Sequence, residues 1–135
     1  MADLDRYREH GLLLMRVGLG TMFVLHGWPK LAGGAKSWAK LGAEMKHLGI
    51  DFAPEVWGFA AGISELGGGI LLALGLLFRP ACVALIATMA VATISHLAKG
   101  QPIVRASHAI EAGITFAGLF LLGPGKFSLD ARRGG

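Results

Sequence analysis

Several side chains that can carry or transfer protons lie within or beside the long apolar stretches of this 135-residue sequence. They are His26, Glu65, His96, His108 and Glu111. Histidine titrates near neutral pH and can donate or accept a hydrogen bond, and a carboxylate in an apolar setting can take or relay a proton. We therefore predict a proton-handling or ligand-binding pocket, with catalytic roles for His26, Glu65, His108 and Glu111.

Arg16 adds a positive charge to the first apolar stretch. A charged side chain in the middle of a membrane helix costs about 2.5–3.5 kcal/mol, so it needs a partner. If Tyr7 and Trp57 mark opposite membrane interfaces, a helical rise of about 1.5 Å per residue brings Arg16 and Glu65 within roughly 6 Å of the same depth. We predict an Arg16–Glu65 ion pair near the middle of the bilayer. The alternative is that this pairing is purely structural.

The histidines are expected at one level of the molecule. His26 ends the first apolar stretch, His96 ends the third, and His108 begins the fourth, with Glu111 three positions later on the same helix face. We assign Arg16, His26 and His96 to cofactor binding. The alternative is that each histidine only caps a helix at the membrane interface. No HxxxH or HExxH spacing occurs, so we assign no metal ligands.

The composition indicates which solvent surrounds these residues. The chain is 53% hydrophobic and only 16% charged, whereas a soluble domain carries about 25% charged residues. Too little polar surface is available to cover a water-facing globule, so we expect the lipid bilayer as the partner. The formal net charge is +4, but Lys and Arg lie between the apolar runs, which is typical of contact with anionic lipid headgroups. We expect no nucleic-acid partner.

Four apolar segments have the length of membrane-spanning helices. They cover about residues 11–28, 56–78, 81–97 and 106–122. The first is bounded by Tyr7 and Trp28, which are roughly 31 Å apart along a helix, close to the thickness of a hydrocarbon core of about 30 Å. Arg79-Pro80 is expected to make a tight reversal between the second and third spans. The pattern predicts a single all-α domain, an integral membrane four-helix bundle.

A short helix is predicted between the first and second spans. Trp38, Leu41, Met45 and Leu48 recur at helical spacing there, which favours an amphipathic helix lying at the membrane interface. The alternative is a loop helix packed on the end of the bundle. Many of the 21 glycines lie within the spans, and we interpret them as sites of close helix packing, with a dimer interface as the alternative.

The orientation of the bundle follows only weakly from charge. An even number of spans puts both termini on one side of the membrane. Lys and Arg are divided equally between the two sides, so the positive-inside rule does not decide. The first helix and the short hairpin usually dominate, and on that ground we expect cytoplasmic termini.

Several segments together resemble the DoxX family of small bacterial membrane proteins. They are RVGLGTMFVLHGWPKL at 16–31, SELGGGILLALGLLFRP at 64–80, HAIEAG at 108–113 and GPGKFSLD at 123–130. The resemblance implies a multi-pass four-helix bundle in the bacterial cytoplasmic (inner) membrane with cytoplasmic termini. It also implies a link to oxidoreductases, since known relatives include subunits of thiosulfate:quinone oxidoreductase and proteins of oxidative-stress complexes or of catechol and quinone resistance. Arg16, His26, Glu65 and Glu111 match polar positions of the family pattern.

The leading functional hypothesis is a component of a quinone-linked oxidoreductase. In it His26 and His108 donate hydrogen bonds to a quinone, Glu65 and Glu111 relay protons, and Arg16 orients Glu65. One alternative is a non-catalytic membrane scaffold for a soluble redox partner. Another is a small proton-linked transporter that works as a homo-oligomer. The sequence leaves open whether the chain is itself an enzyme, and quinone is the only cofactor it suggests.

Overall fold

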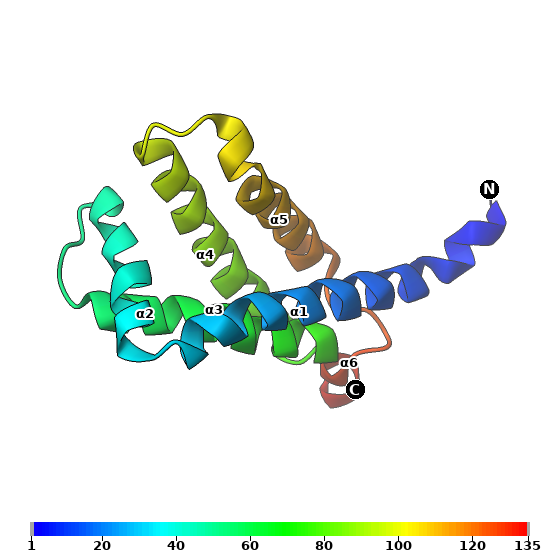
Figure 1. Ribbon diagram of the computed structural model, residues 1–135. Coiled ribbons are helices and arrows are strands. Elements are labelled where there is room, and N and C mark those ends of the chain that lie inside the picture. The colour runs from blue at the N-terminus through cyan, green and yellow to red at the C-terminus, as the bar shows by residue number, and fades with distance from the viewer. Residues whose placement is uncertain (1, 135) are drawn as a thin grey trace.

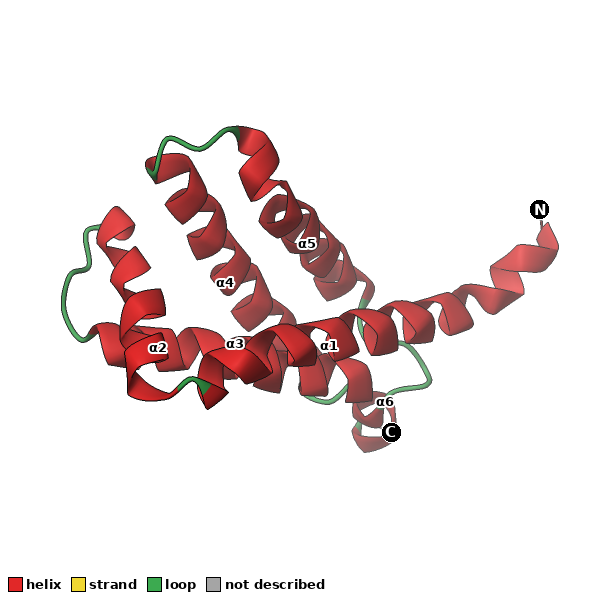
Figure 2. Ribbon diagram, viewed as in Figure 1, coloured by secondary structure: helices red, strands yellow, loops and turns green. Residues whose placement is uncertain are grey.

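The computed structural model describes residues 2–134, and within them the chain forms helices and no β-strand. The long helices are α1 (Arg8–Ala32), α3 (Pro54–Leu74), α4 (Phe78–Ala98) and α5 (Ile103–Leu122). The short helical segments are η1 (Ala2–Tyr7), α2 (Gly34–Gly42), η2 (Ala43–Leu48) and α6 (Leu129–Arg133) (Figures 1 and 2). The prediction of an all-α fold with four long helices and a short helix between the first two is confirmed.

The outer surface of these helices is strongly apolar. Leu14, Val104, Ile114 and Leu121 are each more than two-thirds exposed. Within the described residues, three helical stretches are long and apolar enough to cross a membrane, namely Asp3–Ala32, Pro54–Leu74 and Phe78–Ala98. Helix α5 is not among them, since Arg105, His108 and Glu111 lie in its first half. The fourth membrane span therefore stays a prediction, although the helix itself forms over the predicted residues.

The long helices are arranged in two pairs. Helix α1 lies along α3, and α4 lies along α5 (Figure 1). The second pair is steeply tilted against the first, and both termini lie at the end of the molecule where α3 turns into α4. Helix α2 and η2 fold back over the N-terminal half of α3, at the opposite end from the termini.

Glycines set the register of α1 against α3. A Cβ atom added to Gly20 would lie 2.5 Å from the carbonyl oxygen of Gly69, and one added to Gly27 would lie 2.5 Å from the backbone nitrogen of Leu66. Gly58 plays the same part for α2, because its added Cβ would fall 1.7 Å from the carbonyl oxygen of Trp38. Small residues let these backbones approach closely. The interpretation of the glycines as packing sites is confirmed at these positions, and α2 is a helix packed on the bundle.

The reversal between α3 and α4 lies at Gly75–Leu77, so the prediction that Arg79-Pro80 makes it is wrong. Gly75 and Leu77 have left-handed φ angles of 67° and 47°. Pro80 lies in the first turn of α4, where its missing N–H removes no helical hydrogen bond. A proline in the sequence can therefore mark the first turn of a new helix, and the chain reversal then lies a few residues before the proline.

The C-terminal segment is hydrogen-bonded to this reversal. The carboxylate of Asp130 accepts hydrogen bonds from the backbone N–H of Leu77 at 2.9 Å and of Phe78 at 2.8 Å. The N–H of Asp130 in turn donates to the carbonyl of Gly75 at 2.9 Å. Asp130 therefore caps the N-terminus of α4, where free N–H groups and the helix dipole favour a negative charge.

Candidate functional site

A cavity of about 570 Å³ lies between α2–η2, α3 and α4. Its lining is mostly apolar and includes Leu41, Met45, Ala60, Ala84 and Val91. Several polar side chains also line it, namely Lys30, Glu44, Ser64, Glu65, Thr88, Ser95, His96 and Lys99. Small-molecule sites in proteins are commonly concave, apolar and of about 300–1,000 Å³, with few polar groups. This cavity is therefore the best candidate site in the described part of the chain.

Glu65 is the buried acid of the cavity. It extends from α3 and is only 2% exposed. Its Oε1 atom accepts a hydrogen bond from Lys30 Nζ at 2.7 Å, which makes an ion pair between the last turn of α1 and the middle of α3. Its Oε2 atom is buried and has no hydrogen-bond partner. A buried acceptor without a partner is unfavourable. A ligand that donates a hydrogen bond to this oxygen would remove that cost.

Trp57 supplies a second unpartnered polar atom. Its Nε1 atom is buried without a hydrogen-bond partner, and the side chain lines the same cavity. An indole N–H can only donate. Trp57 and Glu65 are both on α3, eight positions apart, which corresponds to about 12 Å along the helix. The residues that line the cavity thus include one buried donor atom and one buried acceptor atom that have no partner in the described chain.

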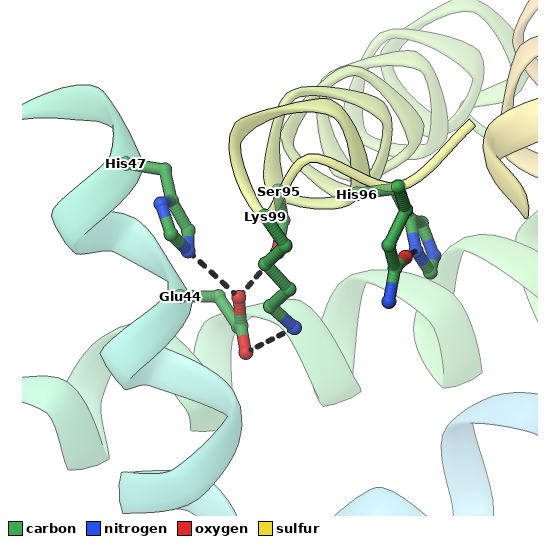
Figure 3. A network of polar contacts seen from close by, with 6 residues as sticks. Glu44, His47, Ser95, His96 and Lys99 are labelled. Carbon is green, nitrogen blue, oxygen red and sulfur yellow. Dashed lines mark hydrogen bonds and ion pairs between the residues drawn. The ribbon is translucent and has the colours of Figure 1, made fainter. Parts of the chain in front are cut away.

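A polar network lies on the rim of the cavity (Figure 3). Glu44 of η2 makes an ion pair with Lys99 at 2.8 Å, accepts a hydrogen bond from Ser95 Oγ, and lies 3.3 Å from His47 Nε2. Burial tends to raise the pKa of Glu44, but the hydrogen bonds from Lys99 and Ser95 and the nearby positive charges outweigh it and lower the pKa. Beside this network, His96 Nδ1 is 2.5 Å from Gln101 Oε1.

Arg16 lies away from the cavity. It is 1% exposed, and its guanidinium donates to main-chain carbonyls only. These are Leu72 O at 3.2 Å, Ala73 O at 3.0 Å, Pro124 O at 2.9 Å and Phe127 O at 3.1 Å. Arg16 therefore ties α1 to the end of α3 and to the C-terminal segment.

The predicted Arg16–Glu65 ion pair is wrong. Glu65 is paired with Lys30 instead. The cause is the register of the two antiparallel helices. Because Gly27 faces Leu66, Glu65 is level with residue 28, about 12 residues or roughly 18 Å along the helix from Arg16. The depth calculation rests on Tyr7 and Trp57 as markers of the two membrane interfaces, whereas the side chain of Trp57 lines the cavity.

Apart from Arg16, the predicted site residues lie in three separate places: between α1 and α5, on the surface of α5, and at the cavity. His26 and His108 lie side by side on α1 and α5, with ring centroids 5.6 Å apart and Phe23 next to both. Both imidazoles are exposed, and Glu111 is exposed on α5. Only Glu65 and His96 line the cavity. The predicted side chains therefore do not form one pocket, and the described residues contain no group of three His, Cys, Asp or Glu placed to hold a metal.

Sequence reasoning missed Lys30, Trp57 and Glu44 as site residues. Lys30 lies beyond the predicted end of the first span at residue 28, but α1 continues past Pro29 to Ala32 and brings Lys30 to Glu65. A usable signal existed, since Lys30 follows His26 by one helical turn within the quoted HGWPKL segment. Glu44 had no such signal, because only the folding of η2 against α4 brings it to Lys99.

Comparisons with known proteins agree with this architecture. The sequence model of the DoxX family matches residues 11–98, which include every lining residue of the cavity except Lys99. The inner membrane protein YphA of Escherichia coli (strain K12) is 31% identical over 141 residues, which cover 96% of this chain and 95% of YphA. No solved structure matches the chain. The family match and the near full-length similarity show that the chain belongs to the DoxX family.

Proposed function

We propose that this chain binds the ring of a quinone or quinol in the cavity between α2–η2, α3 and α4, as the membrane component of a quinone-linked oxidoreductase. The observation that carries the proposal is the buried Oε2 atom of Glu65, which has no hydrogen-bond partner within a mostly apolar cavity. We place the chain in the inner membrane, where YphA is found, with its termini in the cytoplasm.

The polar atoms of the cavity favour the reduced form of the ring. Glu65 forms an ion pair with Lys30, and a carboxylate can only accept hydrogen bonds. The indole N–H of Trp57 can only donate. A quinol satisfies both, since one hydroxyl donates to Glu65 and the other oxygen accepts from Trp57. A quinone has acceptors only and would leave Glu65 Oε2 unsatisfied.

The size and lining of the cavity suit such a ring. The α3 backbone rises about 12 Å between Trp57 and Glu65, which is comparable to a six-membered ring with an oxygen at each end and a hydrogen bond beyond each oxygen. Alanines form much of the α3 and α4 walls, including Ala60, Ala61, Ala84 and Ala87. Their small side chains leave room for the flat ring and its apolar substituents.

Proton transfer is the chemical role that the residues of the chain can play. Oxidation of a quinol releases two protons and two electrons. In our proposal Glu65 accepts the proton of the hydroxyl that it binds, the second proton leaves to water at the mouth of the cavity, and both electrons pass to a soluble electron carrier, which is reduced. Lys30 balances the charge of Glu65 before the transfer. His26, His108 and Glu111 lie outside the cavity and do not contact the ring in this scheme.

Equilibrium dialysis of the purified full chain in nanodiscs against trimethylhydroquinone, without oxygen, tests the proposal. We expect saturable binding that is weaker for the matching quinone and for the dimethyl ether, which cannot donate. Glu65→Gln should weaken quinol binding by about tenfold or more, the effect of one hydrogen bond to a charged group.

Glu111→Gln is the matched control, because it removes an exposed carboxylate from α5, and it should leave binding unchanged. Absence of saturable binding would overturn the proposal. If Glu65→Gln and Glu111→Gln weakened quinol binding equally, the cavity would not be the binding site.

A further inference from the structure

The segment η2 differs from α2 in how it is held. Helix α2 is locked onto α3, because a Cβ on Gly42 would fall 1.7 Å from Pro54 O, as close as the approach at Gly58. Segment η2 begins directly after Gly42 and has no buried residue. It is a six-residue 3₁₀ helix, a form with weaker hydrogen-bond geometry than an α-helix, and it ends at Gly49, where φ is 81°. The segment can therefore move while α2 stays in place.

One side chain fastens η2 across the cavity to α4. The carboxylate of Glu44 makes the ion pair with Lys99 and accepts the hydrogen bond from Ser95 (Figure 3). Among residues 2–134 no other side-chain hydrogen bond or ion pair joins η2 to α4. All three side chains line the cavity, together with Met45 of η2.

We propose that η2 is a lid over the cavity and that Glu44 is its latch. When Glu44 holds Lys99 and Ser95, η2 closes the side of the cavity that faces α4. When the latch breaks, η2 swings about Gly42 and Gly49, and the cavity opens toward Ser64 and Glu65. The lid governs entry of any molecule, so the inference does not depend on the ligand being a quinol.

The latch is suited to repeated opening. The side chains of Glu44 and Lys99 are 28% and 41% exposed, and water and salt screen ion pairs of this kind. His47 is the other titratable group close to Glu44, and it belongs to η2 itself. It therefore moves with the lid and adds no link to α4. Loss of Glu44 should shift the lid toward its open state without disturbing the α2–α3 packing.

Thiol labelling measures the open population. Ser64→Cys places a thiol of similar size in the cavity wall, and the single native cysteine, Cys82, is fully buried and gives the background. In the full chain in nanodiscs, a water-soluble maleimide should label Ser64→Cys about five- to tenfold faster when Glu44→Ala is added, the effect of one exposed ion pair and one hydrogen bond.

Two further variants separate the latch from a general loss of structure. Lys99→Gln breaks the same contact from α4, so it should raise the rate similarly and add little in combination with Glu44→Ala. Glu55→Ala removes an exposed glutamate from the start of α3 and should leave the rate unchanged. Unchanged labelling in both Glu44→Ala and Lys99→Gln would overturn the lid, and so would an equal increase in Glu55→Ala.

Discussion

Replacement of Arg16 by leucine should destabilise the chain more than any other substitution of an arginine. The guanidinium is buried and donates four hydrogen bonds to carbonyls on the end of α3 and on the C-terminal segment. Leucine fills part of the volume but removes the donor from all four contacts, and of these carbonyls Leu72 O keeps a second hydrogen bond, from the N–H of Gly75. The change therefore tests whether Arg16 is the central tie between α1, α3 and the C-terminus.

The expected magnitude follows from these contacts. A hydrogen bond to a charged group contributes about 1.5–3 kcal/mol, so four would contribute about 6–12 kcal/mol. The leucine variant no longer has to bury a charge, and the desolvation penalty that it avoids is several kcal/mol. The difference predicts a loss of about 3–5 kcal/mol in the free energy of unfolding. Lysine should recover only part of it, because its point charge cannot reach all four oxygens.

Unfolding in mixed micelles, titrated with sodium dodecyl sulfate and followed by circular dichroism, measures this loss. Arg79→Leu is the matched control, because Arg79 is exposed and donates a single hydrogen bond to Phe120 O at 2.9 Å. It should cost about 1 kcal/mol. If the two variants lost the same stability, the four contacts of Arg16 would not have the importance that we give them.

Three other changes test different parts of the fold. Gly58→Ala should separate α2 from α3, because the added Cβ would overlap the α2 backbone, whereas Gly67→Ala meets nothing within 4 Å and should be neutral or slightly stabilising in thermal melts. Asp130→Ala should cost about 1–2 kcal/mol in the micelle titration by uncapping α4, and Asp130→Asn less. The folded pKa of Glu44 lies below its ordinary value of 4.5, so its contribution to the closed lid is complete above that value and lost as the pH falls through the folded pKa. The hydrogen-exchange protection factors of η2 should therefore stay constant down to about pH 5 and decline at lower pH, and protection that does not decline in acid would contradict the latch.

The helices could be predicted because hydropathy and helix punctuation are local properties. Each long helix forms within a few residues of its predicted bounds. The position of the α3–α4 reversal did not follow from the sequence, because Pro80 is compatible both with a break and with the first turn of a helix.

The site could be predicted only in part. Glu65 was identified because a carboxylate in an apolar run is costly and must be sheltered. Its partner was not, since Lys30 and Arg16 are both cations on α1 and only the glycine contacts with α3 decide which one reaches it. The partners of Arg16 are main-chain carbonyls, which every residue carries and no sequence pattern marks.

The sequence by itself determined that this protein is a set of long apolar helices with a few polar groups that need shelter, because the transfer of side chains from water depends on composition summed along the chain. Only the tertiary structure decided that Glu65 meets Lys30, that Trp57 lines the same cavity, and that Glu44 reaches Ser95 of α4 and Lys99 at its end. These pairings depend on helix register and on the angle between the two helix pairs, and both are set by contacts between residues far apart in the chain.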